Sequence, residues 1–241
     1  MLNDLRIAVS FLTILPLGMP HSTQVGRSFA WYPLVGMLIG GGGMAIAMLP
    51  ISEQTRAWLG VVAWVILTGG LHLDGFGDTC DGMFASVPLE RRREIMKDPR
   101  TGTWAVVGLI VLLLGKFVGL QALHSPVLWV LPPMLGRWAM VLAVQFFPSN
   151  STGLGAYFRT GFLPRHTVFA TASLLAVVVA VIPFTTPRVL AVIPLTLGLT
   201  VLIGRMAQQR LGGLNGDVYG FLCEAVELMA LYALGGGIWA N

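Results

Sequence analysis

Charged residues are unusually scarce in this sequence. Only 11% of its 241 residues are Asp, Glu, Lys or Arg, whereas a soluble domain carries about 25%. Hydrophobic residues make up 55% of the chain. This balance excludes an ordinary soluble domain and indicates a protein embedded in a lipid bilayer. We therefore expect the bilayer as a partner, and no nucleic acid.

Cysteine is also scarce, and its placement excludes two kinds of site. Cys80 and Cys223 are the only two cysteines, and neither belongs to a pair separated by two residues, so a thiolate metal site is not expected. Both lie beside acidic motifs that we assign to the cytoplasm, where thiols stay reduced. No disulfide is therefore expected.

The N-terminal apolar stretch lacks the features of a signal peptide. Asp4 precedes residues 7–17, no small-residue cleavage site follows them, and Pro16 and Pro20 would break a helix there. We predict an uncleaved amphipathic or re-entrant segment. Further along, no repeat or linker divides the chain, so one catalytic transmembrane domain over 1–241 is expected.

Seven apolar runs are long enough to cross the hydrocarbon, which takes about 20 residues. None of them alternates apolar with polar residues, which argues against a β-barrel. The first run is rich in glycine, which favours an interior helix because small residues let helices approach closely. The sequence thus predicts an all-α polytopic helical bundle with spans near 33–50, 57–73, 102–123, 127–147, 166–183, 188–204 and 221–239.

The distribution of Lys and Arg predicts the orientation. With the N-terminus in the cytoplasm, eleven basic residues fall inside and two, Arg56 and Arg188, fall outside, which is the bias seen in membrane proteins. We predict a multi-pass protein of the cell (inner) membrane whose long polar segments, and active site, face the cytoplasm. The inside residues are Arg6, Arg27, Arg91, Arg92, Arg93, Lys97, Arg100, Arg159, Arg165, Arg205 and Arg210.

Three aspartates follow the second span at spacings of four and three residues. On a helix, Asp74, Asp78 and Asp81 would lie on one face. Stacked carboxylates repel each other by roughly 3 kcal/mol per adjacent pair at an effective dielectric near 20. Solvated loop aspartates would be the plain alternative, but three at the end of a span, flanked by glycines, favour a site for a hard divalent cation such as Mg²⁺, Mn²⁺ or Ca²⁺.

A second acidic group opens the last span. Asp217 and Glu224 are seven residues apart and share a helix face, and Glu227 follows. Asp217 also suits an ordinary helix N-terminus. Glu224 and Glu227 fall inside an apolar run, where carboxylates are functional by default.

Basic residues and one histidine complete the candidate site. Lys116 and Arg137 lie inside spans and need neutralising partners, and we expect Glu224 or Glu227 to pair with one of them. Arg159 follows a loop, 153–158, that we expect to close over a substrate. On a regular helix His72 points away from the aspartates, and a lone histidine is usually structural. Our candidate substrate-binding residues are His72, Lys97, Arg100, Lys116, Arg137 and Arg159.

The stretch Gly69–Gly82 resembles the signature of the cobalamin synthase family, the adenosylcobinamide-GDP ribazoletransferases. Blocks at 27–36, 94–103 with Lys116, 136–137 and 212–217 with Glu224 are similar to further parts of that family, so the resemblance covers nearly the whole chain. It implies transfer of α-ribazole, or its 5′-phosphate, to adenosylcobinamide-GDP with release of GMP.

The resemblance also implies Mg²⁺ as cofactor. Phosphoryl chemistry of this kind relies on metal ions that bridge phosphate oxygens. The expected metal ligands are Asp74, Asp78, Asp81 and Asp217, and the expected catalytic residues are these four with Glu224. Which carboxylate acts as the base, and whether the protein is a homo-oligomer, stay open.

Two other functions share some of these features. The aspartates and glycines at 78–82 and 213–217 also resemble the CDP-alcohol phosphotransferases, but Phe221 occupies the position of that family's last aspartate. A cation-coupled transporter would hold its ions near the membrane midplane at a repeat interface. Here the aspartates lie at the ends of spans and no repeat is visible, which counts against transport.

Overall fold

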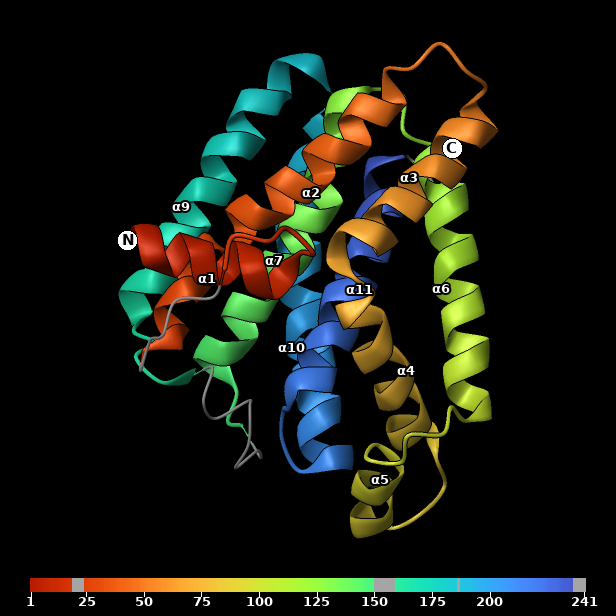
Figure 1. Cartoon of the computed structure of the whole chain (residues 1–241), viewed down its shortest axis with the longest axis vertical. Coiled ribbons are helices and arrows are strands. Elements are labelled where there is room, and N and C mark those ends of the chain that lie inside the picture. Colours follow the sequence, from red (N-terminus) through yellow and green to blue (C-terminus); the bar gives the residue numbers. More distant parts are fainter. Residues whose placement is uncertain (19–23, 150–158, 186, 236–241) are drawn as a thin grey trace.

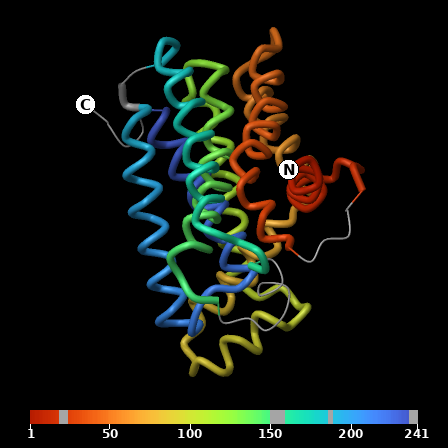
Figure 2. The backbone as a smooth tube through the Cα atoms, turned by 90° about the vertical axis from the view of Figure 1, so that its left-hand side faces the viewer, coloured from red at the N-terminus to blue at the C-terminus, as the bar shows by residue number. Residues whose placement is uncertain are grey.

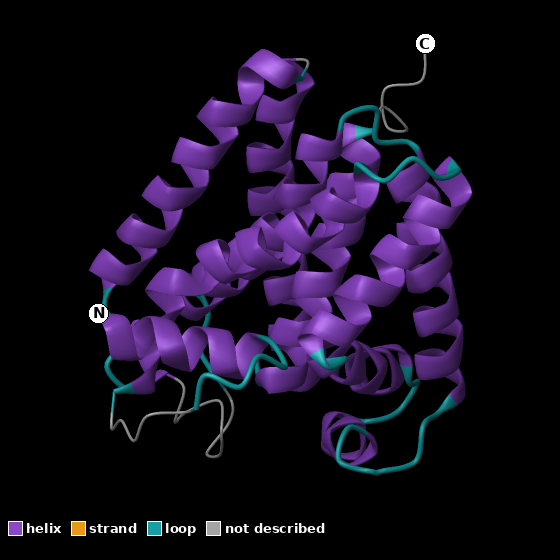
Figure 3. Ribbon diagram, turned by 45° about the horizontal axis from the view of Figure 1, so that its top comes forward, coloured by secondary structure: helices purple, strands orange, loops and turns teal. Residues whose placement is uncertain are grey.

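The part of the chain that the structure describes is mainly helical. The structure is a computed structural model, and it describes residues 1–18, 24–149, 159–185 and 187–235. In these ranges no strand forms, and β-type pairing is limited to an isolated bridge between Ser149 and Leu214 (Figure 3). The predicted all-α class is confirmed.

The helices connect into a bundle whose elements are labelled in Figure 1. In chain order they are α1 (Leu2–Leu12), η1 (Val25–Trp31), α2 (Tyr32–Ala47), α3 (Glu53–Thr68), α4 (Leu71–Phe84), α5 (Leu89–Ile95), α6 (Thr103–Gln121), η2 (Pro126–Val130), α7 (Leu131–Phe146), α9 (Pro164–Val181), η3 (Ile182–Phe184), η4 (Pro187–Ala191), α10 (Val192–Leu211) and α11 (Gly216–Leu234).

The predicted spans correspond to these helices, with differences in detail. Five described segments are long and apolar enough to cross a membrane: Val25–Ala47, Thr103–Gln121, Pro126–Phe146, Pro164–Phe184 and Val189–Leu211. A sixth results if α3 and α4 form one bent span. The seventh predicted span is α11, whose three carboxylates set it apart from the apolar five. The protein is thus a multi-pass membrane protein.

A sharp bend at Gly69 and Gly70 replaces the predicted straight span over 57–73. Both glycines have φ values in the left-handed region, 61° and 69°. Residues other than glycine rarely adopt this backbone conformation. α3 therefore ends at Thr68, and α4 leaves at 92° to it (Figure 1). The bend carries the aspartates of α4 against α11.

The core is formed by α7 and α11. Every residue of α7 from Leu131 to Val144 is buried, and α7 packs against both α2 and α11. The close contact between α2 and α7 confirms the interior position predicted for the glycine-rich run. By contrast, α6, α9 and α10 expose apolar side chains such as Ile110, Val168 and Leu202, as expected of surfaces that face lipid.

The N-terminal helix lies outside the bundle. Figure 2 shows α1 end-on, crosswise to the long helices. It buries Ile7 and Leu12 while Leu2 and Arg6 stay exposed. This two-sided character confirms the predicted amphipathic segment.

Candidate active site

The three clustered aspartates lie on one helix, as their spacing predicts. Asp74, Asp78 and Asp81 all belong to α4. Exposure falls along the helix, since Asp74 is exposed, Asp78 is half-buried and Asp81 is buried. The carboxylate face thus runs from the surface into the protein.

Asp81 is engaged by the start of the next long helix. Its two carboxylate oxygens accept hydrogen bonds from the backbone N–H groups of Gly102, at 2.7 Å, and Ala105, at 2.9 Å. Asp81 therefore caps the N-terminus of α6, where unpaired N–H groups favour a negative charge. The sequence did not predict this role, because the partners are more than twenty residues away along the chain.

Asp217 meets the face of α4 from the first turn of α11. Gly75 makes this approach possible, since a Cβ atom at Gly75 would lie only 2.8 Å from Asp217 Cα. Asn215 holds the turn: its side-chain oxygen accepts from Val218 N–H at 3.0 Å and its amide donates to Asp217 at 2.8 Å. Asn215 was not among the predicted site residues, although an asparagine just before a helix commonly caps the helix N-terminus.

Four carboxylates are thus brought together. The charges of Asp217, Asp74 and Asp81 all act on Asp78. With the side chains as they stand, no three His, Cys, Asp or Glu groups among the described residues surround one point closely enough to hold a metal ion. The chemistry of the donors nevertheless fits Mg²⁺, which prefers carboxylate oxygens and keeps several waters.

The intramembrane cations are paired with the glutamates of α11. Lys116 on α6 lies 2.5 Å from both Glu224 and Glu227, and Arg137 on α7 contacts Glu227. All four side chains are buried, and the ring of Trp64 lies 5.8 Å from the ammonium group. The predicted pairing with one cation is confirmed, and the structure adds the second. Two positive and two negative charges leave this cluster neutral.

The surface cations differ in whether they already donate hydrogen bonds to other groups of the protein. Lys97 and Arg100 are exposed, and Arg100 donates to Asp98 at 2.9 and 2.6 Å. These hydrogen bonds hold the pKa of the Asp98 carboxyl well below its usual range. Arg159 instead donates to the carbonyls of Phe147 and Val144 at the end of α7. The loop 153–158, expected to close over a substrate, lies outside the described residues.

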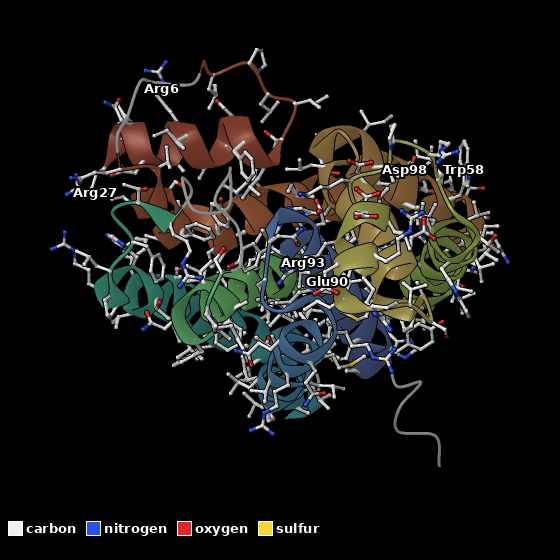
Figure 4. All side chains as sticks on the ribbon, turned by 90° about the horizontal axis from the view of Figure 1, so that it is seen from below. Arg6, Arg27, Trp58, Glu90, Arg93 and Asp98 are labelled. Carbon is white, nitrogen blue, oxygen red and sulfur yellow. The ribbon has the colours of Figure 1, made fainter. Side chains whose placement is uncertain are left out.

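Part of the basic run before Lys97 is structural. Arg92 donates to the carbonyl of Met83 at 2.6 Å, and Arg93 donates to that of Leu211 at 2.9 Å. These bonds fasten α5 to the ends of α4 and α10. Figure 4, seen from below, shows Arg93 and Glu90 near the middle of the molecule, and Arg6 and Arg27 beside α1.

A cavity of about 190 Å³ adjoins Asp74 and Asp217. His72 lines it together with Tyr32 and Tyr219, two tyrosines that the sequence analysis did not single out. His72 is only 4% exposed. The cavity and the carboxylates thus form one continuous site between α4 and α11.

Phe221 has a packing role in this site. Its ring stacks on that of Phe76 with the centroids 4.8 Å apart. The position at which a CDP-alcohol phosphotransferase would carry a carboxylate therefore contributes an aromatic contact between α4 and α11.

The chain is similar to known proteins along nearly its whole length. A family model described as cobalamin-5-phosphate synthase matches residues 4–235. The chain is 38% identical to the adenosylcobinamide-GDP ribazoletransferase of Desulforamulus reducens, covering 97% of this chain and 96% of the relative. It is 39% identical to that of Roseiflexus sp., covering 94% and 87%, and 40% identical to that of Stutzerimonas stutzeri, covering 95% and 96%. No solved structure gives a significant match.

Proposed function

The chain belongs to the cobalamin-5-phosphate synthase family, and we propose from this that it joins α-ribazole, or its 5′-phosphate, to adenosylcobinamide-GDP and releases GMP. The observation that carries the proposal is the meeting of carboxylates from α4 and α11 beside a cavity and near surface cations. A substrate with two phosphates needs this combination of groups.

In the proposed reaction a ribose hydroxyl attacks the phosphorus on the cobinamide side of the pyrophosphate. A new P–O bond forms, the bond from that phosphorus to the bridging oxygen breaks, and GMP leaves with the bridging oxygen. The hydroxyl proton passes to a carboxylate of Asp74, Asp78 or Asp217, which acts as general base.

Asp74, Asp78 and Asp217 would hold Mg²⁺, with Asp81 behind them on the same face. When bound, the ion neutralises charge that develops on the phosphate oxygens. Because Asp81 accepts two backbone hydrogen bonds, its main part in the proposal is to fix α4 against α6. Asp74 and Asp217, which line the cavity, would orient the attacking hydroxyl.

We assign the pyrophosphate to the surface cations. Lys97 and Arg100 are exposed near the end of α4, so a hydrated, highly charged group can reach them without entering the membrane. Lys116 and Arg137, also candidates from the sequence, already neutralise Glu224 and Glu227. In our proposal this buried cluster positions α11, and Glu224 acts through that position.

The orientation of the site is also part of the proposal. The eleven-to-two distribution of basic residues favours an active site facing the cytoplasm of an inner membrane. Cys80 and Cys223 are both buried, so they give little background to an impermeant maleimide. An engineered Ser86→Cys should react in broken but not in intact cells, and labelling in intact cells would reverse the orientation.

A direct assay tests the reaction. Purified protein in detergent, given adenosylcobinamide-GDP, α-ribazole and Mg²⁺, should release GMP and form the ribazole-containing corrinoid in equal amounts. The same preparation should be tested with a CDP-alcohol and an alcohol acceptor. Transfer from the CDP-alcohol without any GMP release would refute the proposal in favour of the lipid enzyme.

A further inference from the structure

The cavity between α1, α2, α4 and α11 contains a buried polar group without a partner. Its wall is mainly aromatic and apolar and includes Phe11, Phe29, Tyr32 and Met140. His72 also lines it, and neither of its ring nitrogens has a hydrogen-bond partner among the described residues. A buried polar group normally finds a partner, because leaving it unpaired costs free energy.

His72 is also held in place by its surroundings. Its backbone packs on α11, where a Cβ atom at Gly220 would lie 3.0 Å from the His72 carbonyl oxygen. The charges of Arg137, Glu227 and Lys116 act on its ring, so the imidazole lies between the cavity and the neutral ion cluster. The unpartnered nitrogens are therefore a fixed feature of the site.

We propose that this cavity binds the aromatic base of the nucleoside acceptor and that His72 donates a hydrogen bond to the free ring nitrogen of that base. The inference rests on the proposed function, because it assigns a place to one of its two substrates. A flat heterocycle suits an aromatic wall, and a single ring nitrogen suits a single imidazole donor.

Size and position agree with this occupant. About 150 Å³ of apolar cavity is enough for a benzene ring, so about 190 Å³ suits a small fused heterocycle and is far too small for a corrin ring. Asp74 and Asp217 line the same cavity. A base seated against His72 would therefore place its attached ribose, and the attacking hydroxyl, beside the carboxylates.

Guanine fits the cavity less well. Its several donors and acceptors would each need a partner when buried. Asp74 and Asp217 are already assigned to the metal and the attacking hydroxyl, which leaves only His72 and two tyrosines of this wall for the base. The guanosine of the donor substrate is thus assigned to the exposed cations, and the cavity to the acceptor.

Equilibrium binding of α-ribazole and of benzimidazole to detergent-purified protein tests the inference. His72→Phe keeps an aromatic ring and removes the donor, so the Kd of both ligands should rise about tenfold. His72→Gln keeps a donor and should restore part of the affinity. His124→Phe is the matched control, because His124 is exposed and belongs to a different pocket, and it should bind like wild type.

Steady-state kinetics separate this inference from the proposed function. His72→Phe should raise the KM for α-ribazole about tenfold and leave the KM for adenosylcobinamide-GDP unchanged. Normal ribazole transfer with an unchanged KM and Kd would overturn the cavity assignment alone. Binding of benzimidazole that depends on His72, without any ribazole transfer, would support the cavity for aromatic heterocycles and refute the proposed reaction. Melting temperatures of all variants show whether each is folded.

Discussion

The two charged regions of α11 use similar residues in opposite ways. In its middle, Glu224 and Glu227 are buried and paired with Lys116 and Arg137, so the charges cancel. In its first turn, Asp217 meets the carboxylates of α4, and the cluster is uniformly negative. Buried charges that cancel need no ligand, and losing one partner is costly, whereas like charges held together are stable only when a cation or proton joins them. The contrast indicates a structural region and a ligand-binding region on one helix.

Removing metal should affect only the negative region around Asp217. Of all the changes considered, it should reduce the activity most. Chelation with EDTA is expected to abolish GMP release, and added Mg²⁺ should restore it, because phosphoryl transfer needs the charge of the ion. Mg²⁺ should also raise the melting temperature, since a ligand that binds the folded state stabilises it. Full activity after exhaustive chelation would show that the carboxylates work without metal.

Asp78→Asn tests the same region from the protein side. Turnover should fall at least about a hundredfold, the scale of losing one electrostatic group in a site, while the melting temperature in detergent stays near that of wild type. The added Mg²⁺ should no longer raise that temperature by the same amount. Glu90→Gln on α5, an exposed carboxylate that does not line the cavity shared by Asp74 and Asp217, is the control and should keep wild-type turnover.

Lys116→Met tests the neutral region. It leaves Glu224 and one oxygen of Glu227 without their cation, and breaking a buried pair in this way costs about 3–5 kcal/mol. Thermal unfolding in detergent should show a clear loss of stability. Lys97→Met, at the exposed lysine, should melt like wild type.

A double variant sharpens this test. Combining Lys116→Met with Glu224→Gln removes the uncompensated negative charge of Glu224 and should recover part of the lost stability. Such non-additive effects are expected when two residues are in contact. If Lys116→Met melted normally but showed a much higher KM for adenosylcobinamide-GDP, the lysine would belong to the substrate site.

The smallest effect is expected at the surface. Arg100→Met should raise the KM for adenosylcobinamide-GDP by roughly tenfold, the loss of one charge-assisted hydrogen bond, with little change in kcat. Arg91→Met is a close match, because Arg91 is also exposed and paired with a neighbouring carboxylate, Glu94, at 2.6 Å. An equal rise in KM for both variants would mean that general surface charge, and not Arg100 itself, attracts the nucleotide.

Much of the site was predictable because local spacing reveals it. The positions of Asp74, Asp78 and Asp81 predicted one helix face, and they lie on one helix. Lys116 within an apolar run demanded a carboxylate, and α11 supplies two. Such predictions succeed because helix periodicity and the cost of a charge in lipid depend on the sequence near each residue.

The partners of single side chains were less predictable. Nothing near Asp81 shows that it caps α6, and nothing near Arg159 shows that it caps α7. The burial of His72 beside a cavity, and the tyrosines that share it, were likewise outside the reach of a local pattern. These contacts join segments that are distant along the chain.

Composition and residue spacing were enough to predict the membrane class, the approximate spans and a carboxylate face near basic residues. Helix packing sets which carboxylates stay open to a ligand and which are used by the fold. It does so through the bend at Gly69 and Gly70 and the close contact at Gly75, which bring α4 against α11. The physical reason is that composition and periodicity act over a few turns of helix, whereas a side chain's partner depends on how whole helices pack.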